Sequence, residues 1–239
     1  MTAASPPTWP AGFAIHEREA KPDSELVEAL RGVPTTIVSD CLGSCVGALG
    51  LEPFHGDRSL ALCGVALTVR VRPGDNLMIH KALTLARPGD VIVVDGSGEL
   101  SHALVGGLMR LAALARGVAG FVLDGAIRDV AEWAEGELPV FARGHSHRRP
   151  SKDGPGEINV PITCAGLAVA PGDLVLGDAD GVVAVSPGRL AQLLGEVRAK
   201  QALEEEQQRH QLASRHDPSL LVRDDERADE MLRAKGCPV

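Results

Sequence analysis

The chain has 239 residues, a length that suits one large domain or two small ones. Hydrophobic residues make up 44% of it and charged residues 23%, a balance typical of globular proteins that excludes a disordered chain. The 24 basic and 32 acidic side chains give a formal net charge of −8, and there are only four Phe, two Trp and no Tyr. Proteins that coat nucleic-acid phosphates carry the opposite charge, so we expect no nucleic-acid partner.

No stretch approaches the roughly 18–20 uninterrupted apolar residues of a membrane helix, so we expect no membrane partner either. Residues 1–13 lack the basic region and apolar run of a secretory signal. The five cysteines are odd in number, and Cys41 and Cys45 are four apart, but no second Cys/His pair follows at zinc-ligand spacing. This favours small core residues in a reducing compartment. These features predict a cytoplasmic protein.

The first predicted element is an irregular arm, residues 1–24, rich in Pro and polar residues. Asp23 and Ser24 can cap a short helix over residues 25–31. The next predicted elements are a short helix beginning near residues 39–40, a half-buried strand over 59–72, a turn at Pro73–Asn76 and a helix over 77–86.

The centre of the chain alternates strands and helices. The continuous apolar run 91–95 predicts a strand covered on both faces, hence a layered α/β sheet. A Gly-rich loop, a helix over 106–117, a strand over 119–124, a loop and a helix starting near 128–129 follow. Strand, loop and helix thus occur twice in succession, which predicts a parallel βαβ crossover. Short strands are expected at 140–142, 166–169, 174–176 and 182–185.

The composition changes after Gly188. In residues 189–239, 19 of 51 side chains are charged, against 37 of 188 before them. Residues 189–215 read as one long charged helix, which either packs on a neighbouring subunit or projects into solvent. We therefore predict three regions: the arm, an α/β domain over 25–188 and a charged helical extension over 189–239.

The loop after the first buried strand offers a candidate anion site. Two glycines let a ligand approach the backbone closely, and free N–H groups at a helix N-terminus favour a carboxylate or phosphate. The alternative is that the glycines only allow a tight turn or close packing. A dinucleotide-binding motif is less well supported, because Gly96 and Gly98 are followed by Ser101 where a third Gly belongs. The candidate residues are Gly106, Gly107, Leu108 and Met109.

The loop after the second buried strand carries Arg128, Asp129 and Glu132. Two carboxylates on one helical face, without nearby Cys or His, suit a hard cation such as Mg²⁺ or Mn²⁺. The arginine offers planar donors to a carboxylate or a developing oxyanion. The alternative is a helix N-terminus enriched in acids by the dipole, with Arg128 in a surface ion pair.

Several histidines are weaker candidates. His145 and His147 lie in a basic loop that can bind an anion or simply be solvated. His80 and His102 can act as general acids or bases, or serve structural roles.

Twenty residues separate Gly107 from Arg128, and Asp129 and Glu132 follow. This pattern resembles the Gly-X20-Arg-Asp-X2-Glu/Asp signature of the metal-dependent 4-hydroxy-4-methyl-2-oxoglutarate / 4-carboxy-4-hydroxy-2-oxoadipate aldolases. Those enzymes share an α-β-β-α sandwich fold with RraA-like regulators of ribonuclease E activity. The segments 140–144 and 171–185 add to the likeness, which covers residues 25–190.

The resemblance implies a role for each residue of the motif. The backbone amides of 106–109 would hold the pyruvyl carboxylate, and Arg128 would hold the C2 oxygen and stabilise the enolate. Asp129 would ligate Mg²⁺ or Mn²⁺, with Glu132 orienting the site or its waters. The implied reaction is a retro-aldol cleavage to pyruvate and a 2-oxo acid, in which a metal-organised base, a water, takes the C4 hydroxyl proton. Oxaloacetate decarboxylation is an implied side activity.

The resemblance also implies a homotrimer or homohexamer with sites between subunits. An acid from the neighbouring subunit's C-terminal region would complete each site, and Glu204, Glu205 and Glu206 are candidates. One alternative is a non-catalytic regulator that binds a protein; these lack the acid that matches Glu132. Another is a lyase for a different 2-oxo or sugar acid.

Overall fold

In the computed structural model, the structure describes residues 12–18, 21–43 and 46–238. Most of the predicted N-terminal arm, residues 1–11 and 19–20, lies outside them. Within the described part of that arm, Phe13–Ile15 form strand β1 where the sequence predicted irregular chain. The chain divides into two compact units, Met1–Leu194 and Gly195–Val239.

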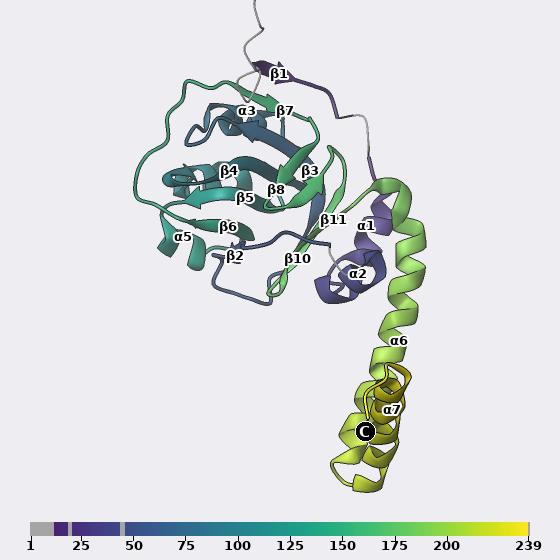
Figure 1. Ribbon diagram of the computed structural model, residues 1–239. Helices are drawn as coiled ribbons and strands as arrows, with labels where there is room; N and C mark the ends of the chain where they lie inside the picture. Colours follow the sequence, from purple (N-terminus) through teal and green to yellow (C-terminus); the bar gives the residue numbers. More distant parts are fainter. Residues whose placement is uncertain (1–11, 19–20, 44–45, 239) are drawn as a thin grey trace, which may run out of the picture. The chain divides into compact units, whose positions relative to one another are not determined.

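The first unit contains a nine-stranded mixed sheet (Figure 1). Its four central strands lie side by side in chain order and run parallel: β3 (Leu62–Val71), β4 (Asp90–Val105), β5 (Gly120–Ile127) and β6 (Val140–His145). The five flanking strands are β1, which pairs with β7, and β2 (Glu52–Pro53), β7 (Gly156–Ile158), β10 (Leu174–Asp178) and β11 (Gly181–Val185). β2 pairs antiparallel with β6, while β7 and β10 pair antiparallel with opposite halves of β3.

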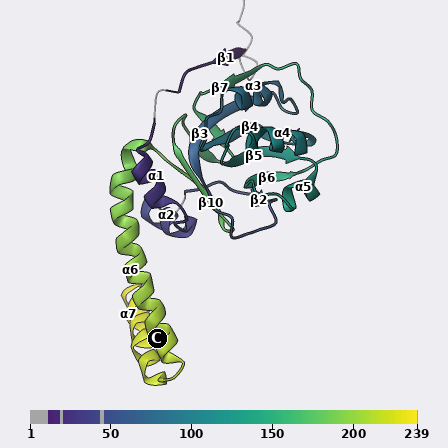
Figure 2. The same cartoon turned by 180° about the vertical axis from the view of Figure 1, so that it is seen from behind.

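Three short helices connect the parallel strands: α3 (Leu77–Leu85), α4 (Gly107–Leu114) and α5 (Val130–Ala134). All three cover one face of the sheet, as parallel βαβ units of one hand require (Figure 2). The predicted βαβ pattern is confirmed, with three units in place of the two that the sequence predicted. Helices α1 (Ser24–Leu30) and α2 (Thr35–Leu42) precede the sheet, and Asp23 caps α1 through the N–H of Glu25, as predicted.

Each face of the sheet has its own apolar core. On the helix side, Ile79 of α3, Met109 of α4 and Trp133 of α5 pack on β4 and β5. On the other side, the hairpin of β8 (Ile162–Cys164) and β9 (Leu167–Val169) packs on the same strands. Strands buried on both faces account for the continuous apolar run that the sequence shows at 91–95.

Strand β4 extends well beyond its predicted end. The sequence predicted a loop after Asp95, but the chain bulges through Ser97 and Gly98, both at positive φ, and pairs with β5 again at Ala103 and Val105. The carboxyl end of β4 is therefore Val105, directly before the glycine pair. This longer strand fixes where the candidate anion site lies.

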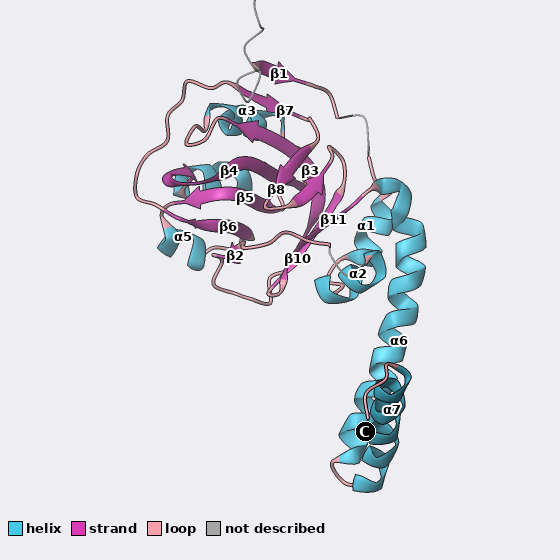
Figure 3. Ribbon diagram, viewed as in Figure 1, coloured by secondary structure: helices cyan, strands magenta, loops and turns pink. Residues whose placement is uncertain are grey.

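The C-terminal region is helical, as predicted (Figure 3). Helix α6 spans Leu190–Ser214, close to the predicted 189–215, and the sequence analysis did not identify the helix that follows it, α7 (Leu221–Ala234). Among the described residues, no helix is both long and apolar enough to cross a membrane.

Candidate active site

The predicted anion-binding turn and the predicted Arg-Asp pair lie at the ends of two neighbouring strands. Val105 at the end of β4 pairs with Ile127 at the end of β5. The N–H of Arg128 then donates to the C=O of Val105 over 3.0 Å. Because parallel strands end at the same edge of a sheet, Gly106 and Arg128 are brought side by side.

The two glycines are required by the close approach of the acidic segment. A Cβ on Gly106 would lie 2.8 Å from Cγ of Arg128 and 2.5 Å from Oδ2 of Asp129. A Cβ on Gly107 would overlap the carboxylate of Glu132. The glycines therefore do more than allow a tight turn, since they let two carboxylates reach the N-terminus of α4.

Asp129 links the two segments. Its backbone is left-handed, with φ 60° and ψ 43°, a conformation that Asp tolerates better than most residues. It precedes α5 but makes no capping bond to that helix. Instead its Oδ2 accepts the N–H of Gly107 over 2.9 Å, so the carboxylate belongs to α4 rather than to α5.

Glu132 is held in place by its neighbour. Trp133 is fully buried, with its ring edge-on to Phe121 at 5.8 Å, and its Nε1–H donates to the C=O of Arg128 over 3.0 Å. This anchor turns the preceding residue toward α4. The exposed carboxylate of Glu132 forms no ion pair or side-chain hydrogen bond with any residue that the structure describes.

The guanidinium of Arg128 is only weakly paired. Its Nε lies 3.6 Å from Oδ2 of Asp129, and the side chain is 39% exposed. Its two terminal nitrogens donate to no group in the described residues. They are therefore available to a ligand.

The backbone amides of the turn are partly engaged. The Gly107 N–H bonds Asp129, and the N–H of Met109 donates to the C=O of Gly106 over 3.0 Å. The N–H of Leu108 has no acceptor within the described part of the chain, because Leu108 lies in the first turn of α4 and the residues before that turn are extended. Of the four backbone amides predicted to bind an anion, those of Gly107 and Met109 are therefore already engaged.

Carboxylate oxygens are the donors that this site offers to a metal. Oδ1 of Asp129 and the carboxylate of Glu132 suit a hard cation. Across the residues described, one chain holds no cluster of three or more His, Cys, Asp or Glu that would surround a metal ion. A cation here would therefore take its other ligands from water or from another subunit.

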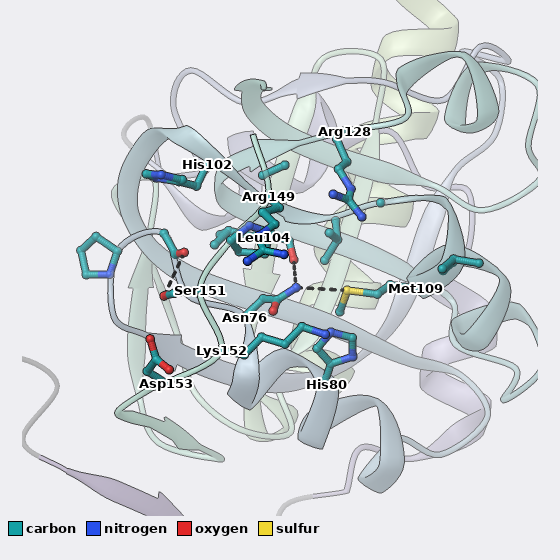
Figure 4. Close-up of a pocket in the computed structure, with 17 residues that line it drawn as sticks. Asn76, His80, His102, Leu104, Met109, Arg128, Arg149, Ser151, Lys152 and Asp153 are labelled. Atoms are coloured by element: carbon teal, nitrogen blue, oxygen red, sulfur yellow. Dashed lines mark hydrogen bonds between the residues drawn. The ribbon is translucent and has the colours of Figure 1, made fainter. Parts of the chain in front are cut away.

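A pocket of about 860 Å³ opens beside the turn (Figure 4). It lies between α3, the end of β4, the start of α4 and residues 149–153, and Arg128, Leu108 and Met109 are among its lining residues. Asp129 and Glu132 do not line it. The two acids therefore lie next to the pocket, and Arg128 reaches into it.

Asp75 ties the pocket wall to the start of α3. Its Oδ2 accepts the hydroxyl of Ser151 over 2.7 Å and the N–H groups of Asp153 and Gly154 over 2.7 and 3.0 Å. Its Oδ1 accepts the N–H of Leu77 over 2.9 Å. Burial acts to raise the pKa of this carboxyl, but the hydrogen bonds outweigh burial and hold the pKa below its ordinary value.

The pocket is cationic in an acidic protein. Arg149 and Lys152 form no ion pair within the described part of the chain. Burial lowers the pKa of His80, and the charge of Lys152 lowers it further, so His80 is neutral at neutral pH. The fully charged side chains that line the pocket are Arg128, Arg149, Lys152 and Asp153.

The weaker candidates divide between the pocket and other places. His80 and His102 line the pocket. His145 lies edge-on to Phe54 at 6.0 Å, outside the pocket lining. His147 is exposed and does not line the pocket either.

A second group of charges lies inside the strands, before their carboxyl ends, and on the opposite face of the sheet. Nε of Arg143 donates to Oδ1 of Asp124 over 2.6 Å, and Oδ2 of Asp124 accepts the N–H of Ala165 over 3.0 Å. Arg70 lies between Asp95 and Glu157. We call this set the hairpin-side cluster: Arg70, Asp95, Asp124, Arg143 and Glu157.

Asn76 is a pocket residue that the sequence pattern predicted only as part of a turn. It is 4% exposed and lies at the bottom of the pocket, where its Nδ2 donates to the C=O of Leu104 over 2.9 Å and contacts Sδ of Met109 at 3.6 Å (Figure 4). The only signal in the sequence is the pair Asp75-Asn76, two capping residue types where a helix needs one.

Comparison with known proteins identifies the family to which this chain is similar. Residues 35–184 match the family described as RraA-like: Aldolase/RraA. A protein of Halalkalibacterium halodurans named "Putative 4-hydroxy-4-methyl-2-oxoglutarate aldolase" is 39% identical over 186 residues, which is 77% of this chain and 88% of that protein.

Solved structures of the same type cover most of the first unit. RraAS2 of Streptomyces coelicolor, described as an unusual member of the RNase ES inhibitor RraA protein family, matches with a TM-score of 0.71 and 26% identity over 79% of this chain and 98% of that chain. The RNA-processing inhibitor RraA from Thermus thermophilis matches with a TM-score of 0.58 and 33% identity, over 64% and 92%. The predicted layered α/β fold is confirmed.

Proposed function

The chain belongs to the RraA-like (Aldolase/RraA) family, and we propose that it is an aldolase that releases pyruvate from a 4-hydroxy-2-oxo acid of the 4-hydroxy-4-methyl-2-oxoglutarate type. The observation that carries the proposal is the meeting of Asp129 and Glu132 at the glycine turn, beside Arg128. A cationic pocket next to these groups supports an anionic substrate.

The substrate's carboxylate end binds at the N-terminus of α4. The Leu108 N–H is available there, and the partial positive charge of the helix end favours an anion. The 2-oxo oxygen then lies within reach of Arg128. The remainder of the substrate extends into the pocket toward Arg149 and Lys152.

Arg128 stabilises the negative charge that develops during cleavage. The C4 hydroxyl loses its proton, the C3–C4 bond breaks, C4 becomes a carbonyl and the bonding pair enters the pyruvate enolate. C3 of the enolate then takes up a proton from water to give pyruvate. The guanidinium donates to the C2 oxygen on which this charge collects. Glu132, which is free of other partners in the described part of the chain, orients the water that accepts the hydroxyl proton.

We further propose that Asp129, with Glu132 beside it, holds Mg²⁺ or Mn²⁺. A divalent cation supplies positive charge that lowers the energy of an enolate oxygen. Because oxaloacetate decarboxylation passes through the same enolate, we expect it as a side activity.

We also propose that the sites lie between subunits of a homotrimer or homohexamer. Leu108 and Leu111 on α4 are 81% and 52% exposed next to the site, which supports a subunit contact there. An acid of the C-terminal region of another subunit would then join the site. Within α6, Oε1 of Glu204 lies 3.7 Å from Nζ of Lys200, so Glu205 and Glu206 are the less engaged candidates.

The test is pyruvate release, followed through lactate dehydrogenase, from 4-hydroxy-4-methyl-2-oxoglutarate and from oxaloacetate. Release that EDTA stops and Mg²⁺ restores is the expected result. Asp129→Asn should abolish it, because Asn tolerates the left-handed backbone and still accepts the Gly107 N–H but carries no charge. Glu135→Gln, at the exposed end of α5, is the matched control and should retain full activity.

The alternative is a non-catalytic regulator that binds a protein; the Thermus relative is described as an RNA-processing inhibitor. A folded, Mg²⁺-loaded sample that releases no pyruvate from either substrate would overturn the aldolase proposal. The regulator would then be favoured, or a lyase for a different 2-oxo or sugar acid.

A further inference from the structure

Asn76 at the bottom of the pocket has a side chain that its own helix does not use. Asparagine before a helix normally accepts an N–H of the first turn. Here Asp75 accepts the Leu77 N–H, and Asn76 makes no capping bond. Its side chain instead joins α3 to the end of β4 through the C=O of Leu104.

The oxygen of this amide has no hydrogen-bond partner among the residues that the structure describes. Oδ1 of Asn76 is buried and accepts no hydrogen bond from any described residue. Rotating the amide would place Oδ1 against the Leu104 C=O, so the observed orientation is the one that keeps the Nδ2 bond. A buried acceptor that receives no hydrogen bond costs free energy. Such an acceptor in a residue that lines a pocket indicates a ligand that donates to it.

The charges of the pocket narrow the choice of donor. Arg128, Arg149 and Lys152 line the pocket against a single acid, Asp153, so an anion is favoured and an amine is repelled. A carboxylate at neutral pH has only acceptors. Among the functional groups of a hydroxylated polycarboxylate, the hydroxyl is the one that can donate to Oδ1 of Asn76.

We propose that Asn76 is a specificity-determining residue whose Oδ1 accepts a hydrogen bond from the hydroxyl of a hydroxylated di- or tricarboxylate. The inference rests on the proposed function, since the C4 hydroxyl is the group that distinguishes an aldol substrate from a simple 2-oxo acid. This hydroxyl has one proton, so it donates to Asn76 in the bound substrate and turns to the water beside Glu132 when the C3–C4 bond breaks. It adds a reason why the pocket prefers the hydroxylated acid: a site built to bond a hydroxyl discriminates strongly against the analogue without it.

The test is calorimetric binding to the full chain of three four-carbon dicarboxylates: malate, succinate and fluorosuccinate. Fluorosuccinate keeps a polar substituent of similar size but cannot donate. EDTA is present throughout, so that the hydroxyl of malate cannot coordinate a cation. Malate should bind about tenfold or more tightly than the other two, which should bind alike.

Asn76→Leu keeps the approximate shape and removes the acceptor. It should bring malate affinity down to that of succinate while leaving succinate affinity unchanged, and the succinate measurement also reports whether the pocket survives. Equal binding of malate and fluorosuccinate by the unaltered chain would overturn the proposal without any variant. So would a malate preference that persists in Asn76→Leu.

The outcomes separate this inference from the proposed function. A malate preference that depends on Asn76, in a protein that releases no pyruvate, would support the hydroxyl subsite and overturn the aldolase. Pyruvate release without any malate preference would do the reverse.

Discussion

Charged residues lie on both faces of the sheet, inside β4 and β5 on one side and just after β5 on the other, and the two sets are built differently. On the hairpin side, Asp124 is buried and takes both Arg143 at 2.6 Å and a backbone N–H. On the helix side, Arg128 and Asp129 are each 39% exposed and meet only at 3.6 Å. One face of the sheet thus carries a closed group of charges and the other an open group.

The difference shows how to separate structural charges from functional ones. Removing a charge from water is costly unless it gains a close partner, so a buried pair with short hydrogen bonds serves the fold. Charges left half-solvated and loosely paired keep their capacity for a ligand. Each prediction below tests this contrast, beginning with the largest expected effect.

Arg128→Ala should lower kcat for pyruvate release by about 10²–10³-fold, because it removes the donor to the developing oxyanion. The free energy of unfolding, measured by urea titration, should change by less than about 0.5 kcal/mol, since the side chain is half-exposed and weakly paired. A stable variant with unchanged kcat would remove Arg128 from the reaction. A large loss of stability would show that Arg128 serves the fold, as the charges on the hairpin side do.

Gly107→Ala should lower kcat by about 10²-fold, since its Cβ displaces the Glu132 carboxylate from the turn. In the Glu132→Ala background the same substitution should cost much less, because nothing remains to displace. The four kcat values form a double-mutant cycle. Additive effects would show that Gly107 acts through something other than Glu132.

Asp75→Asn should destabilise the protein by about 2 kcal/mol at pH 7, since an amide nitrogen cannot accept the donors that Oδ2 now takes. The pKa of this carboxyl is depressed in the folded chain, so its contribution is present above the unfolded value of about 3.9 and lost as pH falls through the folded value. Unfolding free energies of the two proteins should therefore converge at acid pH. A constant gap at every pH would contradict this. Asp75 is buried but lies on the same side of the sheet as the pocket. The result therefore also tests whether a charge stabilises the fold because it is buried or because of the face on which it lies.

Arg143→Met should reduce the free energy of unfolding by about 1 kcal/mol, a small value because the arginine is one-third exposed. Asp124 would keep only the Ala165 N–H. The kcat should stay within about twofold of the unaltered protein, because the cluster lies across the sheet from the pocket. A strong loss of activity at full stability would place the hairpin-side cluster in the reaction.

The repeated strands and helices could be predicted because their signals are local. The apolar run at 91–95 and the helix after the glycine pair depend on residues next to one another in the chain, and the structure places both close to where they were expected. The true end of β4 could not be predicted. The bulge at Ser97 and Gly98 has the composition of a loop, and only pairing with β5 reveals that the strand resumes.

The same reasoning applies to the site. The spacing of Gly107, Arg128 and Asp129 pointed to residues that do lie side by side, because two parallel strands end together. The role of Asn76 depends on Leu104 and Met109, about 30 positions further along the chain. No local pattern reports a contact of that range, so the bottom of the pocket became visible only in three dimensions.

The left-handed backbone of Asp129 restricts what a mutational search can find at this position. Glycine and asparagine accept that conformation but lack a carboxylate, and glutamate has the carboxylate but not the conformation. Glu132 is helical and has no such conflict, so Glu132→Asp changes only the length of the side chain that carries the carboxylate. In a library with all substitutions at both positions, we therefore expect only aspartate to be active at position 129. At position 132 we expect several variants with intermediate activity.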